Sequence, residues 1–407
     1  MAFHMPRAVG PEEAGFGPER LNRLTEALKS DIDKGTVPGA VVLIARRGKI
    51  ACLEALGYRD REAGAPMAPD TIFRIASMTK PFTSVAAMML AEEGRLLLAD
   101  PVARYLPEFA NLKVAIDSDS PSAKKLTKEP MRREMTVQDL LRHTSGLTYA
   151  HLTGPLLKKA YEAANIADEK QTNAELVTKL AGLPLAYQPG STWQYGLSTD
   201  VLGRVVEVAS GTDLDRFIVE RICKPLGLAD TGFGPIDAAR SAQPQVDQTS
   251  GKRPPMRDTA LRPKWIAGGS ALLSTAGDYV RFCQMLLNGG ELDGTRLLSA
   301  STIALMTSDH LSPEIRRSPS TPILFGALAP TPELGIGFGL GFAVRTHSGR
   351  NPLPGSVGDF SWSGVTGTYF WIDPKQQLIA ILMMQAPIQR LHYRYLMRTL
   401  VYQAIVD

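Results

Sequence analysis

The chain has 407 residues, of which 44% are hydrophobic and 21% charged, values ordinary for a soluble globular protein with a large core. The formal net charge of +4 is mild for this length and argues against a nucleic-acid-binding protein. The three cysteines, Cys52, Cys223 and Cys283, are odd in number and far apart, which argues against a disulfide scaffold or a cysteine-rich metal site.

The N-terminal segment and the distribution of apolar residues predict neither export nor a membrane span. Residues 1–7 lack the apolar stretch of a signal peptide. No run reaches the roughly 18 apolar residues that are needed to cross a bilayer. We therefore expect a cytoplasmic protein with no membrane partner.

The first quarter of the chain predicts a helix, a hairpin and a second helix. Apolar residues recur at spacings of three and four over residues 18–34, which is typical of an amphipathic helix. Residues 40–45 and 49–56 are apolar runs around an Arg-Gly turn and predict a β-hairpin. Residues 71–75 resemble a short strand, and a helical run extends from 77 to about 93.

The middle of the chain predicts mainly helices joined by long loops. Helical periodicity occurs over residues 137–141, 174–180, 198–209 and 214–222. Residues 235–260 are polar and rich in proline and glycine, so we expect a connecting loop. Five basic residues between 124 and 133 are interrupted by acidic residues and prolines, and we interpret them as a solvated loop.

Strand patterns return near the C-terminal end. They cover residues 337–345, 368–373 and 377–384, and the turn between the last two predicts antiparallel neighbours. A helical pattern follows over residues 389–406.

The order of these elements predicts an α+β fold. Strands at both ends of the chain with helices between them suggest one sheet domain that is split in sequence. We expect this domain to comprise residues 1–85 and 250–407, with residues 86–249 as an inserted, mainly helical domain.

The strongest candidate for a catalytic nucleophile is Ser77, in the segment 75–81 (IASMTKP). Pro81 fits a helix only near its first turn, which places the helix start near Ser77. Ser77 and Lys80 then lie on one face of the helix, three residues apart. A lysine amine can remove the serine proton when its charged form is destabilised, and the helix N-terminus favours an oxyanion.

Two other interpretations apply to this Ser-x-x-Lys pattern. Serine is a common helix N-cap, and the pattern arises by chance in a chain of this length. It does recur at Ser122-Ala123-Lys124-Lys125, but there no strand precedes it and no apolar helix follows it. We therefore interpret the second copy as non-catalytic.

The wider set of motifs resembles the serine β-lactamase-related family, which includes class C β-lactamases, D-amino-acid peptidases and family VIII carboxylesterases. The matching segments stand in the family's order and span most of the chain. They are 77–80 (SMTK), 141–147 (LRHTSGL), 193–195 (WQY), 225–228 (PLGL), 268–276 (GGSALLSTA) and 362–364 (WSG).

The resemblance implies a β-lactamase/penicillin-binding-protein-like fold, an antiparallel sheet flanked by helices, and a set of site residues. Ser77, Lys80 and Tyr195 would be catalytic, with Tyr195 as a second base that later protonates the leaving group. The backbone N–H groups of Ser77 and Val365 would form the oxyanion hole. His143 lies in a family motif outside the catalytic set, and we interpret it as structural.

Two departures from the β-lactamase pattern bear on the substrate. The third motif of β-lactamases usually begins with a lysine or histidine that binds a substrate carboxylate, but here it begins with Trp362. Leu197 replaces the asparagine of the second motif. Both changes favour neutral esters. The expected substrate-binding residues are Trp362, Ser363, Gly364, Tyr149, Leu197 and Phe360.

The sequence therefore predicts a carboxylesterase acting on short-chain esters through a Ser77 acyl-enzyme, with promiscuous β-lactam hydrolysis as a possible side reaction. The alternatives are a β-lactamase or D,D-peptidase, an acyltransferase of the same fold, and a penicillin-binding sensor that is acylated without turnover. A Ser-His-Asp esterase is disfavoured because no G-x-S-x-G motif occurs. No metal or organic cofactor is expected, and the oligomeric state is not predicted.

Overall fold

The centre of the molecule is an eight-stranded antiparallel sheet in the order β12-β13-β14-β15-β16-β1-β2-β3. The structure is a computed structural model that describes residues 9–116, 125–247 and 250–407. The strands of the sheet are β1 (Gly39–Arg46), β2 (Lys49–Asp60), β3 (Ala65–Pro66), β12 (Ile336–Phe338), β13 (Ala343–Arg345), β14 (Phe360–Ser363), β15 (Tyr369–Asp373) and β16 (Leu378–Met384).

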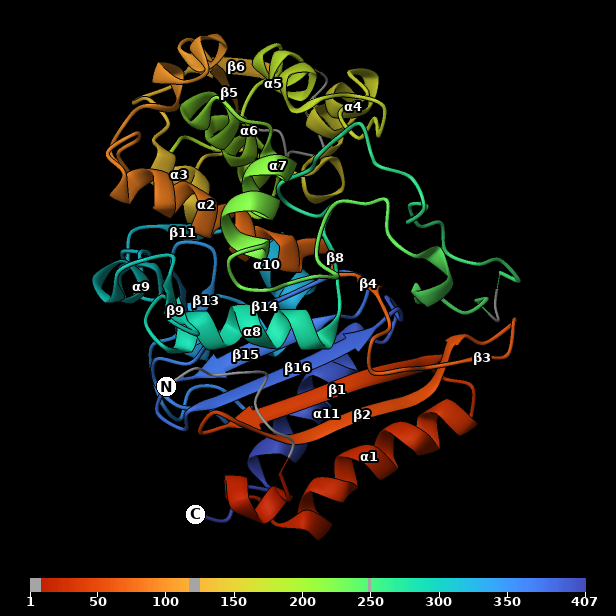
Figure 1. The fold of residues 1–407 in the computed structure, drawn as a ribbon. Coiled ribbons are helices and arrows are strands. Elements are labelled where there is room, and N and C mark those ends of the chain that lie inside the picture. Colours follow the sequence, from red (N-terminus) through yellow and green to blue (C-terminus); the bar gives the residue numbers. More distant parts are fainter. Residues whose placement is uncertain (1–8, 117–124, 248–249) are drawn as a thin grey trace.

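Helices cover both faces of the sheet. One face packs against α1 (Pro18–Asp33) and α11 (Arg390–Tyr402), and the opposite face packs against α8 (Ala276–Leu287) (Figure 1). Because both faces are covered, β1 and β16 are buried along their whole length and do not alternate between apolar and polar residues. The two strands pair from Ala40 with Met384 to Arg46 with Leu378, so residues far apart in the sequence form the middle of the sheet.

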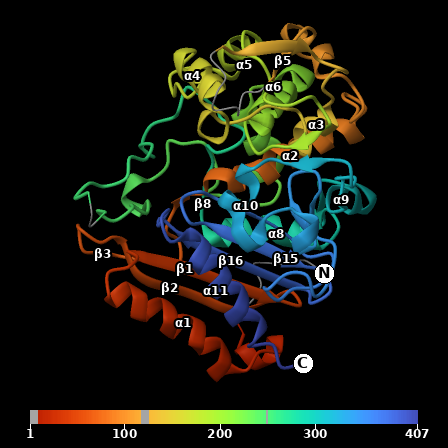
Figure 2. The same cartoon turned by 180° about the vertical axis from the view of Figure 1, so that it is seen from behind.

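A group of helices lies beyond α8, at the end of the molecule opposite α1 (Figure 2). The group consists of α2 (Lys80–Glu92), α3 (Val137–Leu141), α4 (Pro155–Ala163), α5 (Asn173–Ala181), α6 (Ser198–Ser210) and α7 (Leu214–Ile218). Helix α2 lies inside this group and packs against α6, and every residue from Lys80 to Leu90 is buried. A helix that is apolar around its whole circumference is typical of such a central position.

Short elements complete the fold. Strand β4 (Phe73–Arg74) pairs with β8 (Leu273–Ser274), and β7 (Thr192–Trp193) pairs with β11 (Arg316–Arg317). The remaining elements are β5 (Lys113–Ile116), β6 (Thr127–Pro130), β9 (Glu291–Leu292), β10 (Thr295–Arg296), α9 (Ala300–Met306) and α10 (Ser320–Phe325).

Most of the predicted elements are confirmed. The first helix, the hairpin, the antiparallel pairing of β15 with β16 and the final helix occur where the patterns place them. The strand predicted over 337–345 is instead two strands, because the chain reverses at Gly339, whose N–H donates to Phe342 O at 2.8 Å. The helix predicted over 214–222 ends at Ile218 and continues as one π-helical turn to Cys223.

The helix expected from residue 77 begins three residues later than predicted. Residues Ala76–Thr79 form a 3-10 turn, and α2 starts at Lys80. The second Ser-x-x-Lys copy begins at Ser122, which lies outside the described residues.

Within the described ranges, no helix is long and apolar enough to cross a membrane. The same residues contain no group of three or more histidine, cysteine or acidic side chains that could hold a metal ion. The cysteines Cys52, Cys223 and Cys283 are free thiols.

Candidate active site

Ser77 lies in the tight turn between β4 and α2, and the turn is fixed by hydrogen bonds from several elements. Ala76 has a φ of 47°, which is uncommon for a residue with a side chain. The Thr79 hydroxyl donates to Ala76 O at 2.7 Å and accepts from the Leu272 N–H at 3.0 Å. Such surrounding contacts keep a strained turn in place, and strained turns often occur at functional sites.

Lys80 is buried and its amine points back to the nucleophile. Its side chain is 1% exposed. Nζ lies 3.4 Å from Ser77 Oγ, 3.3 Å from Tyr149 Oη and 2.8 Å from Gly269 O. In an apo site these distances are compatible with proton transfer between the serine and the lysine.

The two tyrosines near Lys80 contact it differently. Lys80 Nζ lies 4.8 Å from the centre of the Tyr195 ring, over its face, whereas Tyr149 contacts Nζ through its hydroxyl. Among the described residues, Tyr195 Oη makes no hydrogen bond. Burial raises the pKa of Tyr149 well above its usual value, and the nearby Asp200 and Tyr195 raise it further, so the Tyr149 phenol stays protonated at neutral pH.

A buried carboxylate supports the other side of Lys80. Asp200, at the start of α6, accepts the Gly269 N–H at 3.0 Å, and Gly269 O accepts from Lys80 Nζ. A Cβ at Gly269 would lie 2.7 Å from Asp200 Oδ2, so only glycine fits here. Burial raises the pKa of Asp200, and the positive charge of Lys80 opposes this rise. Asp200 therefore positions the carbonyl that holds Lys80.

The end of β14 is joined to the nucleophile turn. The Thr368 hydroxyl donates to Ile75 O at 3.1 Å, and the Gly364 N–H donates to Thr368 O at 2.8 Å. A Cβ at Gly364 would lie 2.5 Å from Ile75 O. Val365 follows in the turn, and its N–H has no acceptor in the described part of the chain. This N–H is available to an oxyanion.

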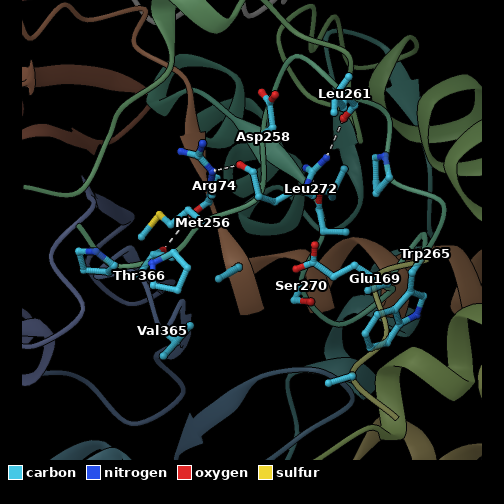
Figure 3. A pocket seen from close by; sticks show the side chains of 18 of the residues that line it. Arg74, Glu169, Met256, Asp258, Leu261, Trp265, Ser270, Leu272, Val365 and Thr366 are labelled. Carbon is cyan, nitrogen blue, oxygen red and sulfur yellow. Dashed lines mark hydrogen bonds between the residues drawn. The ribbon is translucent and has the colours of Figure 1, made fainter. Parts of the chain in front are cut away.

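Two adjoining cavities open at the nucleophile turn. The smaller, about 250 Å³, contains Ser77, Tyr149, Tyr195 and Ser363. The larger, about 720 Å³, is formed mainly by the segment 254–272, with Arg74 and Trp265 on its wall (Figure 3). Both cavities are lined by Ala76, Ser270 and Val365. A substrate can therefore extend in two directions from Ser77.

Not every residue expected at the substrate lies in these cavities. Trp362, Leu197 and Phe360 are 3%, 3% and 2% exposed and line neither cavity. The Trp362 ring packs 5.4 Å from the Tyr195 ring, so it supports that tyrosine from behind. Leu197 and Phe360 belong to the apolar core, and Gly364 packs against Ile75.

His143 is buried between aromatic rings. Its ring lies 5.0 Å from the Tyr195 ring and 5.6 Å from the Phe338 ring. Burial lowers the pKa of His143 well below its usual value, and the charge of Lys80 lowers it further, so the imidazole is neutral. This placement fits the structural interpretation of His143.

Sequence reasoning missed three groups of the site. It placed Tyr149 only on the pocket wall, gave Asp200 no role, and did not identify Arg390 and Arg394, which line the small cavity. Tyr149 follows the segment 141–147 directly, and this proximity was the only sequence signal for it.

Comparisons with known proteins agree with this geometry. The family model described as Beta-lactamase matches residues 24–396. The chain is 37% identical to Protein Rv1367c of Mycobacterium tuberculosis over 370 residues, covering 88% of each protein. It is 32% identical to Esterase EstB of Burkholderia gladioli over 388 residues, covering 89% of each. The solved structure of EstCE1, a hydrolase with promiscuous acyltransferase activity, superposes with a TM-score of 0.77 at 28% identity, covering 94% of this chain and 99% of that one.

Proposed function

This chain belongs to the beta-lactamase family, and from that premise we propose that it is a serine carboxylesterase that hydrolyses short-chain esters through an acyl-enzyme on Ser77. The observation that carries the proposal is the buried Lys80 amine 3.4 Å from Ser77 Oγ. The similarity to Esterase EstB supports ester bonds as the substrate class.

The reaction follows from the positions of the groups around Ser77. Ser77 Oγ attacks the ester carbonyl while its proton passes to the Lys80–Tyr195 pair, and the N–H groups of Ser77 and Val365 bind the oxyanion. As the C–O bond to the alcohol breaks, Tyr195 protonates the leaving oxygen. Water then attacks the acyl-enzyme, gives its proton to the same pair, and releases the acid and Ser77.

Tyr149 and Asp200 act through Lys80 in this scheme. The protonated Tyr149 hydroxyl and the Gly269 carbonyl hold Nζ near the nucleophile. Asp200 fixes the Gly269 peptide through its N–H. Orientation of this kind matters because small displacements of a reacting group cost large factors in rate.

Acyl transfer to an alcohol is the second candidate function. The larger cavity adjoins the nucleophile and has room for an acceptor beside the acyl group. EstCE1, which has a similar fold, is a hydrolase with promiscuous acyltransferase activity. A β-lactamase, a D,D-peptidase and a non-turnover sensor have less support, because the third motif begins with the buried Trp362 instead of a cation.

The first experiment compares p-nitrophenyl acetate, p-nitrophenyl butyrate and a chromogenic cephalosporin as substrates of wild type and Ser77→Ala. We expect fast ester hydrolysis that disappears in the variant, with slow or no cephalosporin cleavage. Preferred cleavage of the cephalosporin would point to a β-lactamase, and full activity of Ser77→Ala would refute the proposed nucleophile. Product analysis with added butanol separates transfer from hydrolysis.

A further inference from the structure

Two arginines of α11 bring positive charge to the small catalytic cavity. Arg390 and Arg394 lie one turn apart at the start of the helix, and both line the cavity with Ser77 and Tyr195. Arg394 is 2% exposed, whereas Arg390 is partly exposed. A guanidinium that is buried this deeply normally has an anionic partner.

The protein supplies no such partner. Arg394 Nη2 donates to Gly364 O at 2.5 Å, and Nε is buried without an acceptor. Arg390 Nη1 donates to Pro387 O at 2.8 Å. In the described part of the chain neither arginine forms an ion pair with a carboxylate. Burial and the charge of Arg390 lower the pKa of Arg394 to about 10, so both groups are still cations at neutral pH.

The next arginine of the same helix shows the usual arrangement. Arg398, one turn after Arg394, donates to Asp359 Oδ2 at 2.9 Å and to Asp359 Oδ1 at 3.1 Å. The two arginines are equally buried, but only the one that lies outside the cavity is neutralised by the protein. The unmet hydrogen-bonding capacity of Arg394 is therefore confined to the place where a substrate binds.

We propose that Arg394 and Arg390 form an anion-binding subsite of the catalytic cavity, and that the physiological substrate is an ester carrying a carboxylate close to its scissile bond. This inference rests on the proposed esterase function and specifies its substrate class. A carboxylate accepts two parallel N–H donors of a guanidinium, which gives it both affinity and orientation.

The position of the subsite limits where the carboxylate lies in the substrate. Arg394 binds the carbonyl of Gly364, and the next residue, Val365, offers its N–H to the oxyanion. The anion is thus held near the reacting carbonyl, within a cavity of about 250 Å³. A small acidic alcohol or a small dicarboxylic half-ester fits this description. The sequence predicted neutral esters because position 362 lacks a cation, whereas α11 brings one from another element.

The test uses two matched pairs of esters that differ only in one negative charge. The first pair is 3-acetoxybenzoate and its methyl ester, with the charge in the leaving group. The second is the mono-p-nitrophenyl ester of adipic acid and its methyl ester, with the charge in the acyl group. The readout is the ratio of kcat/KM for the charged and neutral members, measured in wild type, Arg394→Met, Arg394→Lys, Arg390→Met and the exposed control Lys375→Met.

For at least one pair, we expect the ratio to fall about tenfold or more in Arg394→Met, as for loss of a charge-assisted hydrogen bond, and less in Arg394→Lys and Arg390→Met. Lys375→Met keeps the wild-type ratio. Because the ratio is taken within each variant, a general loss of activity through Gly364 cancels. Equal losses for charged and neutral members of both pairs would overturn the proposal and would assign Arg394 to the Gly364 turn or to Tyr195.

A binding measurement separates this inference from the esterase function. In Ser77→Ala, which cannot be acylated, benzoate should raise the Tm more than benzamide, and Arg390→Met should reduce this difference. If neither ester is hydrolysed but benzoate still binds through Arg390, the esterase proposal fails and the anion subsite stands. If the neutral esters are hydrolysed through Ser77 but benzoate and benzamide act alike in all variants, the subsite fails and the esterase proposal stands.

Discussion

Removing single hydroxyl groups from Tyr149 and Tyr195 distinguishes the base from the residue that positions it. Both rings lie against Lys80, but only the Tyr149 hydroxyl contacts Nζ, at 3.3 Å. Substitution by phenylalanine keeps each ring in place, including the face of Tyr195 that lies 4.8 Å from Nζ. The two variants therefore change the hydroxyls and little else.

The expected magnitudes differ for the two variants. Tyr195→Phe removes an acid–base group and should lower kcat by about 10² to 10⁴. Tyr149→Phe removes one hydrogen bond to a charged group, worth about 1.5–3 kcal/mol, which corresponds to a loss of roughly 10- to 150-fold if the bond is needed only in the transition state. Removing both hydroxyls should cost no more than the sum of the two free energies.

The assay is kcat and kcat/KM for p-nitrophenyl butyrate between pH 6 and pH 9, with Tm measured for each variant. The reasoning would be refuted by near-normal turnover in Tyr195→Phe together with a loss above a thousandfold in Tyr149→Phe. That outcome would make Tyr149 the proton carrier and Tyr195 a ring that only packs on the lysine. A fall in Tm of more than a few degrees would indicate misfolding as the cause of lost activity.

Three further predictions concern the surroundings of the site. Val365→Pro deletes the N–H assigned to the oxyanion hole and should lower kcat by about 10² to 10³ with little change in KM, whereas Val365→Ala should keep most of the activity. Gly364→Ala places a methyl group 2.5 Å from a backbone carbonyl and should reduce both activity and Tm, as a comparison with Gly211→Ala, where no atom lies within 4 Å, can show. Asp139 is buried and, although burial alone would raise its pKa, hydrogen bonds led by that from Arg133 hold the pKa below 3.8; its stabilisation is present above about pH 4 and is lost as the pH falls through the depressed value. Urea unfolding should therefore show Asp139→Asn to be less stable than wild type by about 3–5 kcal/mol at pH 7, and the difference should shrink at pH 3.

Local patterns in the sequence predicted the elements that carry the site, but contacts between distant segments were beyond them. The strand–turn–helix around Ser77 follows from Pro81 and from apolar periodicity, which depend only on neighbouring residues. By contrast, the partners of Lys80 are 69 and 189 positions away, at Tyr149 and Gly269. No periodicity encodes such pairings, because they arise when helices and loops pack together.

Arg394 illustrates the same limit for charge. In the sequence, Arg390, Arg394 and Arg398 form one row at spacings of four, a pattern that resembles a solvated helix face. In the structure Arg398 is paired with Asp359, while Arg394 has no carboxylate. Which arginine is neutralised depends on where Asp359 lies after folding, and the sequence pattern does not contain this information.

The pairing of β1 with β16 has a consequence for how the enzyme is made. The sheet has no middle until residues 378–384 have emerged from the ribosome and aligned beside residues 39–46. Contacts of such long sequence separation cost much loop entropy before they contribute, so we expect slow folding that completes only after synthesis. Nascent chains would then expose an apolar β1 for most of translation, which makes chaperone binding a requirement for good yield. The same delay keeps the hydrolase inactive until nearly all of its chain exists.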